Sequence, residues 1–279
     1  MKTIKLLFFL TYIFSSVTQA SLVNDVNIVP NKNGTTTCVY PGNIYYLNSQ
    51  NDADEFAIKY SQCSTFNGTI FVQQNVHNLP NLPNLKTIDG SLYVLNQYDL
   101  KNFKGLAALE HITKDFYVVG NSGIVNFSGL SNLTNVSGEF EMLDNYNLVD
   151  FQGLDNLKQV GTLTIIRNDN LDNIKELNKL KSVTTALTLY HNASLNTIKG
   201  LNNLSRVGQI HIQNNSKLLN ITALSNAKYT KNDRHETILQ NNPNLKECSG
   251  LCYLKKNAFN FVVENNADAC QDYFSNCVK

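Results

Sequence analysis

Apolar and polar residues alternate in short runs that recur about every 23–24 residues between Gly68 and Leu245. A period of this size indicates stacked supersecondary units rather than one globular core. In each unit the alternation predicts a short strand with two inward apolar side chains. The predicted strands span residues 91–95, 115–119, 139–143, 162–166, 186–190 and 209–213, and their inward pairs are Leu92 and Val94, Phe116 and Val118, Phe140 and Met142, Leu163 and Ile165, Leu187 and Leu189, and Ile210 and Ile212.

Two further short strands are predicted in each unit. The second is a Leu-x-x-(Phe/Ile) step such as Leu148 to Phe151, and the third runs from a Gly-Leu pair to a valine, as from Gly153 to Val160. Apolar residues three apart also fit a helix, so a leucine-rich repeat with one compact helix per unit is an alternative. Short segments, interrupting Gly and Asn, and β-branched residues favour a mainly β fold, a parallel β-solenoid with one coil per unit.

An asparagine stands at the same place in most units, as the first residue of an Asn-x-x-(Leu/Ile) step. The column comprises Asn121, Asn145, Asn168, Asn192, Asn215 and Asn242, with Gln97 at the equivalent place in an earlier unit. We expect each asparagine to adopt the left-handed turn that ends the first strand. Stacked units would also let these amides hydrogen-bond to one another and to the turn backbone, which is a scaffold role.

The first residues have the pattern of a secretory signal. Lys2 and Lys5 precede an apolar stretch from Leu6 to Val17, and Ala20 is a small residue at the expected cleavage position. No later stretch has the ~18–20 consecutive apolar residues of a membrane span. We therefore predict a secreted, extracellular protein with a signal peptide (1–20), an N-terminal segment and cap (21–67), the solenoid (68–247) and a cysteine-containing C-terminal cap (248–279).

Six cysteines lie outside the signal, at Cys38, Cys63, Cys248, Cys252, Cys270 and Cys277. An even number in an exported chain indicates disulfides. Their segregation to the two ends of the repeats favours a Cys38–Cys63 bridge and two bridges among the other four. A zinc site at the C-terminal four is less favoured, because no pair of histidines lies nearby. The segment Asp52–Tyr60 predicts a short amphipathic helix that caps the first coil.

The net charge and the short motifs of the chain limit the kinds of partner that it can be expected to bind. The formal net charge is +1 and no basic cluster occurs, so nothing indicates nucleic acid, and no metal or cofactor is expected. Nine Asn-x-Ser/Thr sequons are present. We expect glycosylation among Asn33, Asn67, Asn126, Asn132, Asn135, Asn203, Asn214 and Asn220. The ninth, Asn192, belongs to the asparagine column and should stay unmodified.

Together these features resemble the receptor L-domain family. The resemblance rests on Cys38 and Cys63 flanking a helix, on Asn67-Gly68-Thr-Ile-Phe-Val, on the coils, and on Asn241-Asn242-Pro243-Asn244-Leu245-x-x-Cys248; it covers residue 38 to about residue 252. The family includes the ligand-binding domains of insulin- and epidermal-growth-factor-type receptors, and fungal cell-wall proteins of the Ecm-thirty-three and sporulation-specific type. It implies a right-handed single-coil β-solenoid that binds a ligand. Without a kinase or a membrane span, receptor signalling is not implied.

The outward residues of the predicted first strands are unusually apolar. The candidate partner-binding residues are Phe71, Tyr93, Leu95, Tyr117, Val119, Leu143, Ile166 and Tyr190. An exposed apolar patch with tyrosines predicts a binding site for an extracellular or cell-surface protein. Self-association through this face, or its cover by residues 21–40 or by the C-terminal tail, remains open.

Two other functions are weighed against partner binding. A structural wall, matrix or adhesion component would bind glycan or pack with its own copies. A polysaccharide-acting enzyme would use Asp144, Arg167 and His191, which fall in one column of adjacent units. Because glycoside hydrolysis needs two carboxylates and this group has one, a solvated Asp144–Arg167 ion pair beside an exposed imidazole is favoured. We therefore assign no catalytic residues and expect a protein that is not an enzyme.

Overall fold

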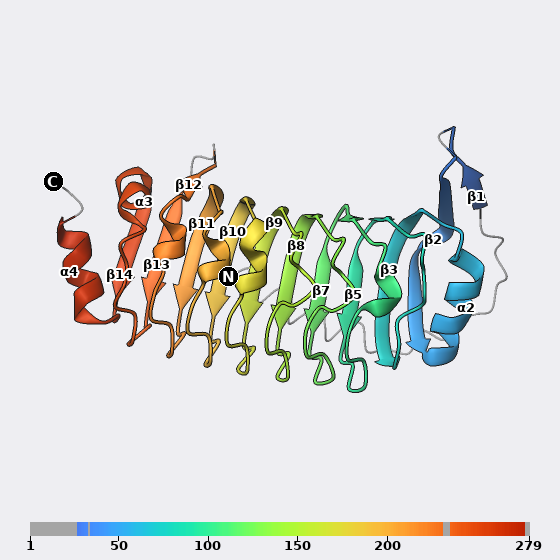
Figure 1. The fold of residues 1–279 in the computed structure, drawn as a ribbon, viewed down its shortest axis with the longest axis horizontal. Coiled ribbons are helices and arrows are strands. Elements are labelled where there is room, and N and C mark those ends of the chain that lie inside the picture. The colour runs from blue at the N-terminus through green and yellow to red at the C-terminus, as the bar shows by residue number, and fades with distance from the viewer. Residues whose placement is uncertain (1–26, 33, 231–234, 277–279) are drawn as a thin grey trace.

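The computed structural model describes residues 27–32, 34–230 and 235–276, so the signal predicted for residues 1–20 lies outside the described residues. This part of the chain is mainly β, with one 14-stranded sheet and a few short helices. The strands lie side by side in chain order along the long axis of the molecule (Figure 1). All of the strand pairings are parallel except the pairing of β1 with β2. Among the described residues, no helix is long and apolar enough to cross a bilayer.

The strands are β1 Asn27–Pro30, β2 Thr36–Ser49, β3 Thr65–Asn75, β4 Thr87–Asp89, β5 Leu92–Leu95, β6 His111–Ile112, β7 Phe116–Val119, β8 Asn135–Leu143, β9 Gln159–Ile166, β10 Ser182–Tyr190, β11 Arg206–Gln213, β12 Lys228–Tyr229, β13 Glu236–Gln240 and β14 Asn260–Glu264. The α-helices are α2 Gln50–Tyr60, α3 Cys252–Asn257 and α4 Asp268–Asn276. The 3-10 helices are η1 Lys104–Leu106, η2 Lys175–Lys179, η3 Lys199–Leu201 and η4 Thr222–Leu224.

The pairing register places each unit directly on the next. Phe116 on β7, for example, pairs with Leu92 on β5 and with Phe140 on β8. All twelve side chains predicted to point inward are at most 1% exposed, which confirms the predicted alternation. Equivalent rings stack on each other inside, as Phe116 does on Phe140 at 4.8 Å between ring centroids. The core is thus a continuous row of matched apolar side chains.

The prediction of two further strands in each unit is largely wrong. The second forms only isolated bridges in the later units, such as Asn173 to Thr197 and Thr197 to Asn220. The third begins as a turn or a 3-10 helix, and only its last residues are extended. They form a short separate strand, such as β6, or join the first strand of the following unit, as Val160 does in β9. Leucines at every third residue bury one side of a tight turn as well as they bury a strand, because a 3-10 helix repeats every three residues.

A helix and a disulfide lie at the N-terminal end of the sheet, as predicted. Helix α2 begins after Ser49, whose side chain accepts a hydrogen bond from the backbone N–H of Asp52 and so caps the helix. The rings of Phe56 and Tyr60 are buried, and both pack against Phe66 of β3. The Cys38–Cys63 disulfide is present. The antiparallel β1–β2 pair beside them was not predicted.

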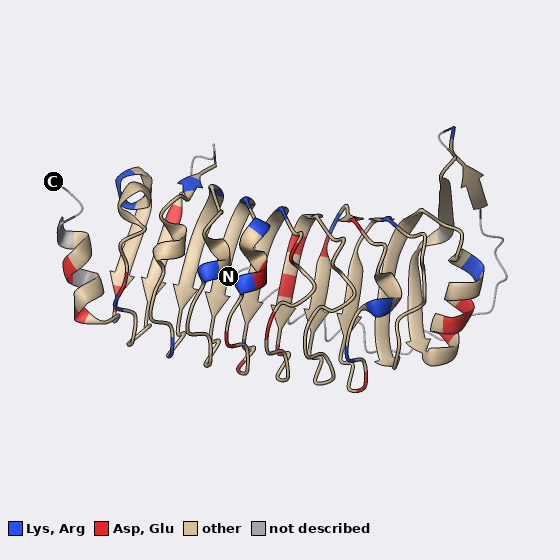
Figure 2. Ribbon diagram, viewed as in Figure 1, with Lys and Arg blue, Asp and Glu red and all other residues tan. Residues whose placement is uncertain are grey.

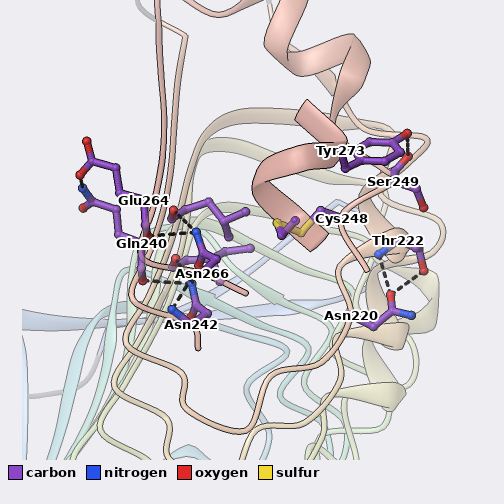
Figure 3. Close-up of a disulfide and its surroundings, with 12 residues drawn as sticks. Asn220, Thr222, Gln240, Asn242, Cys248, Ser249, Glu264, Asn266 and Tyr273 are labelled. Carbon is purple, nitrogen blue, oxygen red and sulfur yellow. Dashed lines mark hydrogen bonds between the residues drawn. A yellow bond between two sulfur atoms is a disulfide. The ribbon is translucent and has the colours of Figure 1, made fainter. Parts of the chain in front are cut away.

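The C-terminal end departs more from expectation. Cys248 forms a disulfide, drawn in Figure 3, with Cys270 of α4. Cys252 is also disulfide-bonded, while Cys277 lies outside the described residues. Residues 248–279 contain a further strand, β14, which pairs in parallel with β13. The segment predicted as a cap therefore extends the sheet before α4 begins. Phe259, which lies in the segment predicted as the C-terminal cap and just before β14, is 83% exposed.

Candidate functional site

A buried row of amides fixes the turn that follows each main strand. Each asparagine is repeated one unit later, and the later Oδ1 accepts a hydrogen bond from the earlier backbone N–H. Asn145 N–H donates to Asn168 Oδ1 at 3.1 Å, and Asn145 Nδ2 donates to the same oxygen and to Val118 O. Figure 3 shows the last step, from Asn242 to Asn266. The predicted scaffold role of the column is confirmed, and Gln97 takes part through its side-chain amide.

The left-handed conformation is not where we predicted it. It falls on the residue before each ladder asparagine, including Arg167 (φ 50°) and His191 (φ 56°). The backbone N–H of that residue continues the parallel ladder, as Arg167 N–H does to Tyr190 O at 3.1 Å. A left-handed backbone is costly for such side chains. The asparagines are therefore required for their hydrogen bonds rather than for their backbone freedom.

The eight candidate partner-binding residues come together on the outer face of the sheet. Two columns of aligned residues form this face: the tyrosine column is Phe71, Tyr93, Tyr117, Glu141, Thr164, Thr188 and His211, and the leucine column is Leu95, Val119, Leu143, Ile166, Tyr190 and Gln213. Their apolar members form a second hydrophobic cluster, separate from the core, which we call the outer cluster. The sheet itself divides the two clusters.

The outer cluster is less exposed than the sequence suggested. Phe71, Leu95, Tyr117, Val119, Leu143 and Ile166 are 5–9% exposed, and Tyr93 and Tyr190 are partly buried. Part of this burial comes from stacking between adjacent strands. The Phe71 and Tyr93 rings lie 4.3 Å apart and 2° from parallel, and the Tyr93 and Tyr117 rings lie 4.8 Å apart and 9° from parallel. Because the ring faces meet one another, the stack turns its ring edges outward.

Carboxylates interrupt the apolar face on β7 and β8. The Tyr117 hydroxyl donates to Glu139 Oε2 at 2.6 Å. Burial and this hydrogen bond raise the pKa of Tyr117 well above its usual value. Glu141 follows Tyr117 in the tyrosine column and is 8% exposed. Burial, with a contribution from Glu139, raises the pKa of Glu141 to about 7.

Asp144, Arg167 and His191 lie on adjacent units at the edge of the outer face. Arg167 Nε and Nη2 donate to the two carboxylate oxygens of Asp144 at 2.6 and 2.7 Å, so the predicted ion pair is present. The hydrogen bond and charge of Asp144 raise the pKa of Arg167. The ring of His191 packs edge-on against Tyr190 at 4.3 Å. Among the described residues, no three His, Cys, Asp or Glu side chains form a group that could hold a metal ion.

The sequons differ in accessibility. Asn192 is fully buried, and its Nδ2 donates to Ile165 O and to Asn215 Oδ1. None of the seven other described sequon asparagines is buried, namely Asn67, Asn126, Asn132, Asn135, Asn203, Asn214 and Asn220; Asn33 lies outside the described residues. Asn132 and Asn203 also belong to a second, exposed amide row, in which Nδ2 donates to a backbone carbonyl of the preceding unit. We did not predict this row, although a recurrent Leu-x-Asn-Leu step marks it, as at Asn132, Asn156 and Asn203.

The chain matches no family model, no curated protein and no solved structure with which we compared it. The function is therefore argued from the geometry of the outer face.

Proposed function

We propose that this chain is a secreted, right-handed parallel β-solenoid of the L-domain type. The parallel register supports this proposal, since hydrogen-bonded ladder residues recur 23 or 24 positions apart over most of the sheet. Disulfides near both ends support export, because such bonds form in oxidising compartments. The helix α2 and the helix α4 then act as caps, which stacked folds require at their two ends.

We further propose that the outer cluster binds an extracellular protein. The observation that carries this proposal is the continuous apolar row from Leu95 to Tyr190, which faces away from the core on adjacent strands. A coil stack needs no apolar residues on this side, because its core is already filled by the inward side chains. Aromatic and aliphatic side chains grouped in this way are typical of the centre of a protein interface.

Glycan binding at this face has less support. Sugars bind to aromatic residues mainly by lying on a ring face, and the faces of Phe71, Tyr93 and Tyr117 are occupied by one another. Polysaccharide cleavage also has less support, because Arg167 already engages both carboxylate oxygens of Asp144. Both functions would require these side chains to separate first.

A glycan placed on the outer face would test the proposal. Thr188→Asn with Tyr190→Thr creates a sequon in the middle of the sheet, and Asp172→Ser creates a matched one at the exposed Asn170. Both proteins would be purified from a secreting host, checked for occupancy and melting temperature, labelled, and applied to intact cells of the source organism. We expect saturable binding by the unmodified protein and by the Asn170 variant, and none by the outer-face variant.

Equal binding by the two glycan variants would contradict the proposal, because a bulky glycan on the outer face should block any partner there. Absence of binding by the unmodified protein would also count against a cell-surface partner.

A further inference from the structure

The middle of the outer face carries acidic groups. Two residues before the tyrosine column lies a third outward column, the edge column, which is Ser91, Asp115, Glu139, Thr162, Ala186 and Gln209. Asp115 stands just before β7 and accepts a hydrogen bond from the backbone N–H of Glu139, which shares β8 with Glu141; Figure 2 shows the acidic residues of β8 in the middle of the sheet. Among the described residues of the three columns, none is lysine or arginine. The middle of the outer face is therefore acidic, although the formal net charge of the whole chain is +1.

Two of these carboxylates have partners in the protein. Asp115 accepts hydrogen bonds from the Ser91 hydroxyl and the Glu139 backbone N–H, at 3.4 and 2.8 Å. Glu139 accepts a hydrogen bond from the Tyr117 hydroxyl. These bonds hold the two carboxylates in place and leave each with further acceptor capacity, since an ionised carboxylate has about four lone-pair sites.

Glu141 is different. It is 8% exposed, yet its carboxylate has no hydrogen-bond or ion-pair partner among the described residues. A buried carboxylate without a partner is unfavourable for folding, because desolvation penalises its charged form. Its strand neighbours are Tyr117 and Thr164, and Leu143 lies two residues further along β8. The site thus combines a largely buried carboxylate that has no partner in the described part of the protein with an apolar surround.

We propose, building on the protein partner inferred above, that the outer face binds a protein segment in which a lysine or arginine is flanked by apolar residues. The cationic group of this lysine or arginine donates hydrogen bonds to the carboxylate of Glu141 and to the remaining lone pairs of Glu139. Its aliphatic stem lies along Leu143, and the apolar neighbours contact the leucine column. A charge-assisted hydrogen bond in a water-excluded site is stronger than a neutral one, and the long stem buries apolar area.

Charge argues against a second copy of this chain as the occupant. A symmetric contact through this face would bring the same patch of both copies together. Glu139 and Glu141 of one copy would then meet acidic residues of the other, and like charges in a desolvated interface are unfavourable. A basic segment is the complementary occupant.

Short random peptides displayed on phage would test this inference. The library would be selected on the purified secreted protein, and the recovered peptides would be measured against Glu141→Gln, against Leu143→Asp, and against Glu55→Gln. Glu55 is an exposed residue on α2, so its variant removes the same charge elsewhere. All variants would be compared at matched melting temperature.

We expect recovered peptides with a lysine or arginine between apolar residues. Their binding should weaken by ~10-fold or more in Glu141→Gln, as for loss of one partner of a buried charged pair, and stay unchanged in Glu55→Gln. Apolar peptides that lose binding in Leu143→Asp but not in Glu141→Gln would overturn the cation site and leave the protein-binding face intact. Both proposals would be overturned if no peptides were recovered, or if the recovered peptides bound both outer-face variants as tightly as the unmodified protein.

Discussion

The amide ladder allows a quantitative prediction at Asn168. Its Oδ1 accepts two hydrogen bonds from Asn145, and its Nδ2 donates to Met142 O and Ile166 O, both at 3.0 Å. Asn168→Ala would leave the buried Asn145 N–H without a partner and would remove the donor from two carbonyls. A buried polar group left unsatisfied costs about 1–3 kcal/mol, so the free energy of unfolding should fall by about 3–5 kcal/mol.

The matched control is Asn170→Ala. Asn170 is exposed, and its Nδ2 makes one hydrogen bond, to Tyr146 O at 2.7 Å. Water can replace that bond, so the free energy of unfolding should fall by less than about 1 kcal/mol. Urea unfolding followed by circular dichroism would measure both variants, and an unchanged dependence on urea would show that the folded states are comparable. Equal losses in the two variants would refute the assignment of the buried ladder as the stabilising element.

Three further predictions rest on single positions. The pKa of Glu141 is about 7 in the folded state against 4.5 for the free side chain, so its penalty for folding is absent below about pH 4.5, grows as the pH rises from there to about 7, and is constant above that. Glu141→Gln should therefore stabilise the protein at pH ~8 by up to about 3 kcal/mol and have little effect near pH ~4, as measured by thermal unfolding at both pH values. Gly208→Ala should destabilise by about 1–3 kcal/mol in urea unfolding, because the added Cβ would lie 2.1 Å from Thr185 O. Glycopeptide mapping should find Asn192 unmodified, because a glycan there would break the ladder; high occupancy would contradict that placement.

The repeat made the inward face and the ladder predictable. Alternation identifies Leu163 and Ile165 as core residues, and a constant spacing identifies Asn168 and its equivalents. Asn266, which continues the ladder, was missed because Ala269 stands where the other units have leucine or isoleucine. Strand β14 was missed for the same reason.

Other features depend on context that one unit does not contain. Arg167 and His191 adopt a left-handed backbone against their intrinsic preference, because stacking fixes the turn on both sides. Strand β2 contains Pro41 and Gly42, which read as a turn rather than as a continuous strand. The burial of Tyr117 depends on its neighbours across the sheet, so alternation along one strand placed it on the outer face without giving its exposure.

The central claim is that the outer cluster binds a protein partner, and a binding isotherm on intact cells tests it most directly. Labelled protein would be compared with the Tyr117→Ser/Leu143→Asp variant, and with Tyr146→Ser/Leu219→Asp, which alters residues that are 53% and 51% exposed outside the outer cluster. All three would be used at matched melting temperature. We predict saturable binding that the first variant loses and the second retains. Equal binding by all three proteins would contradict the account.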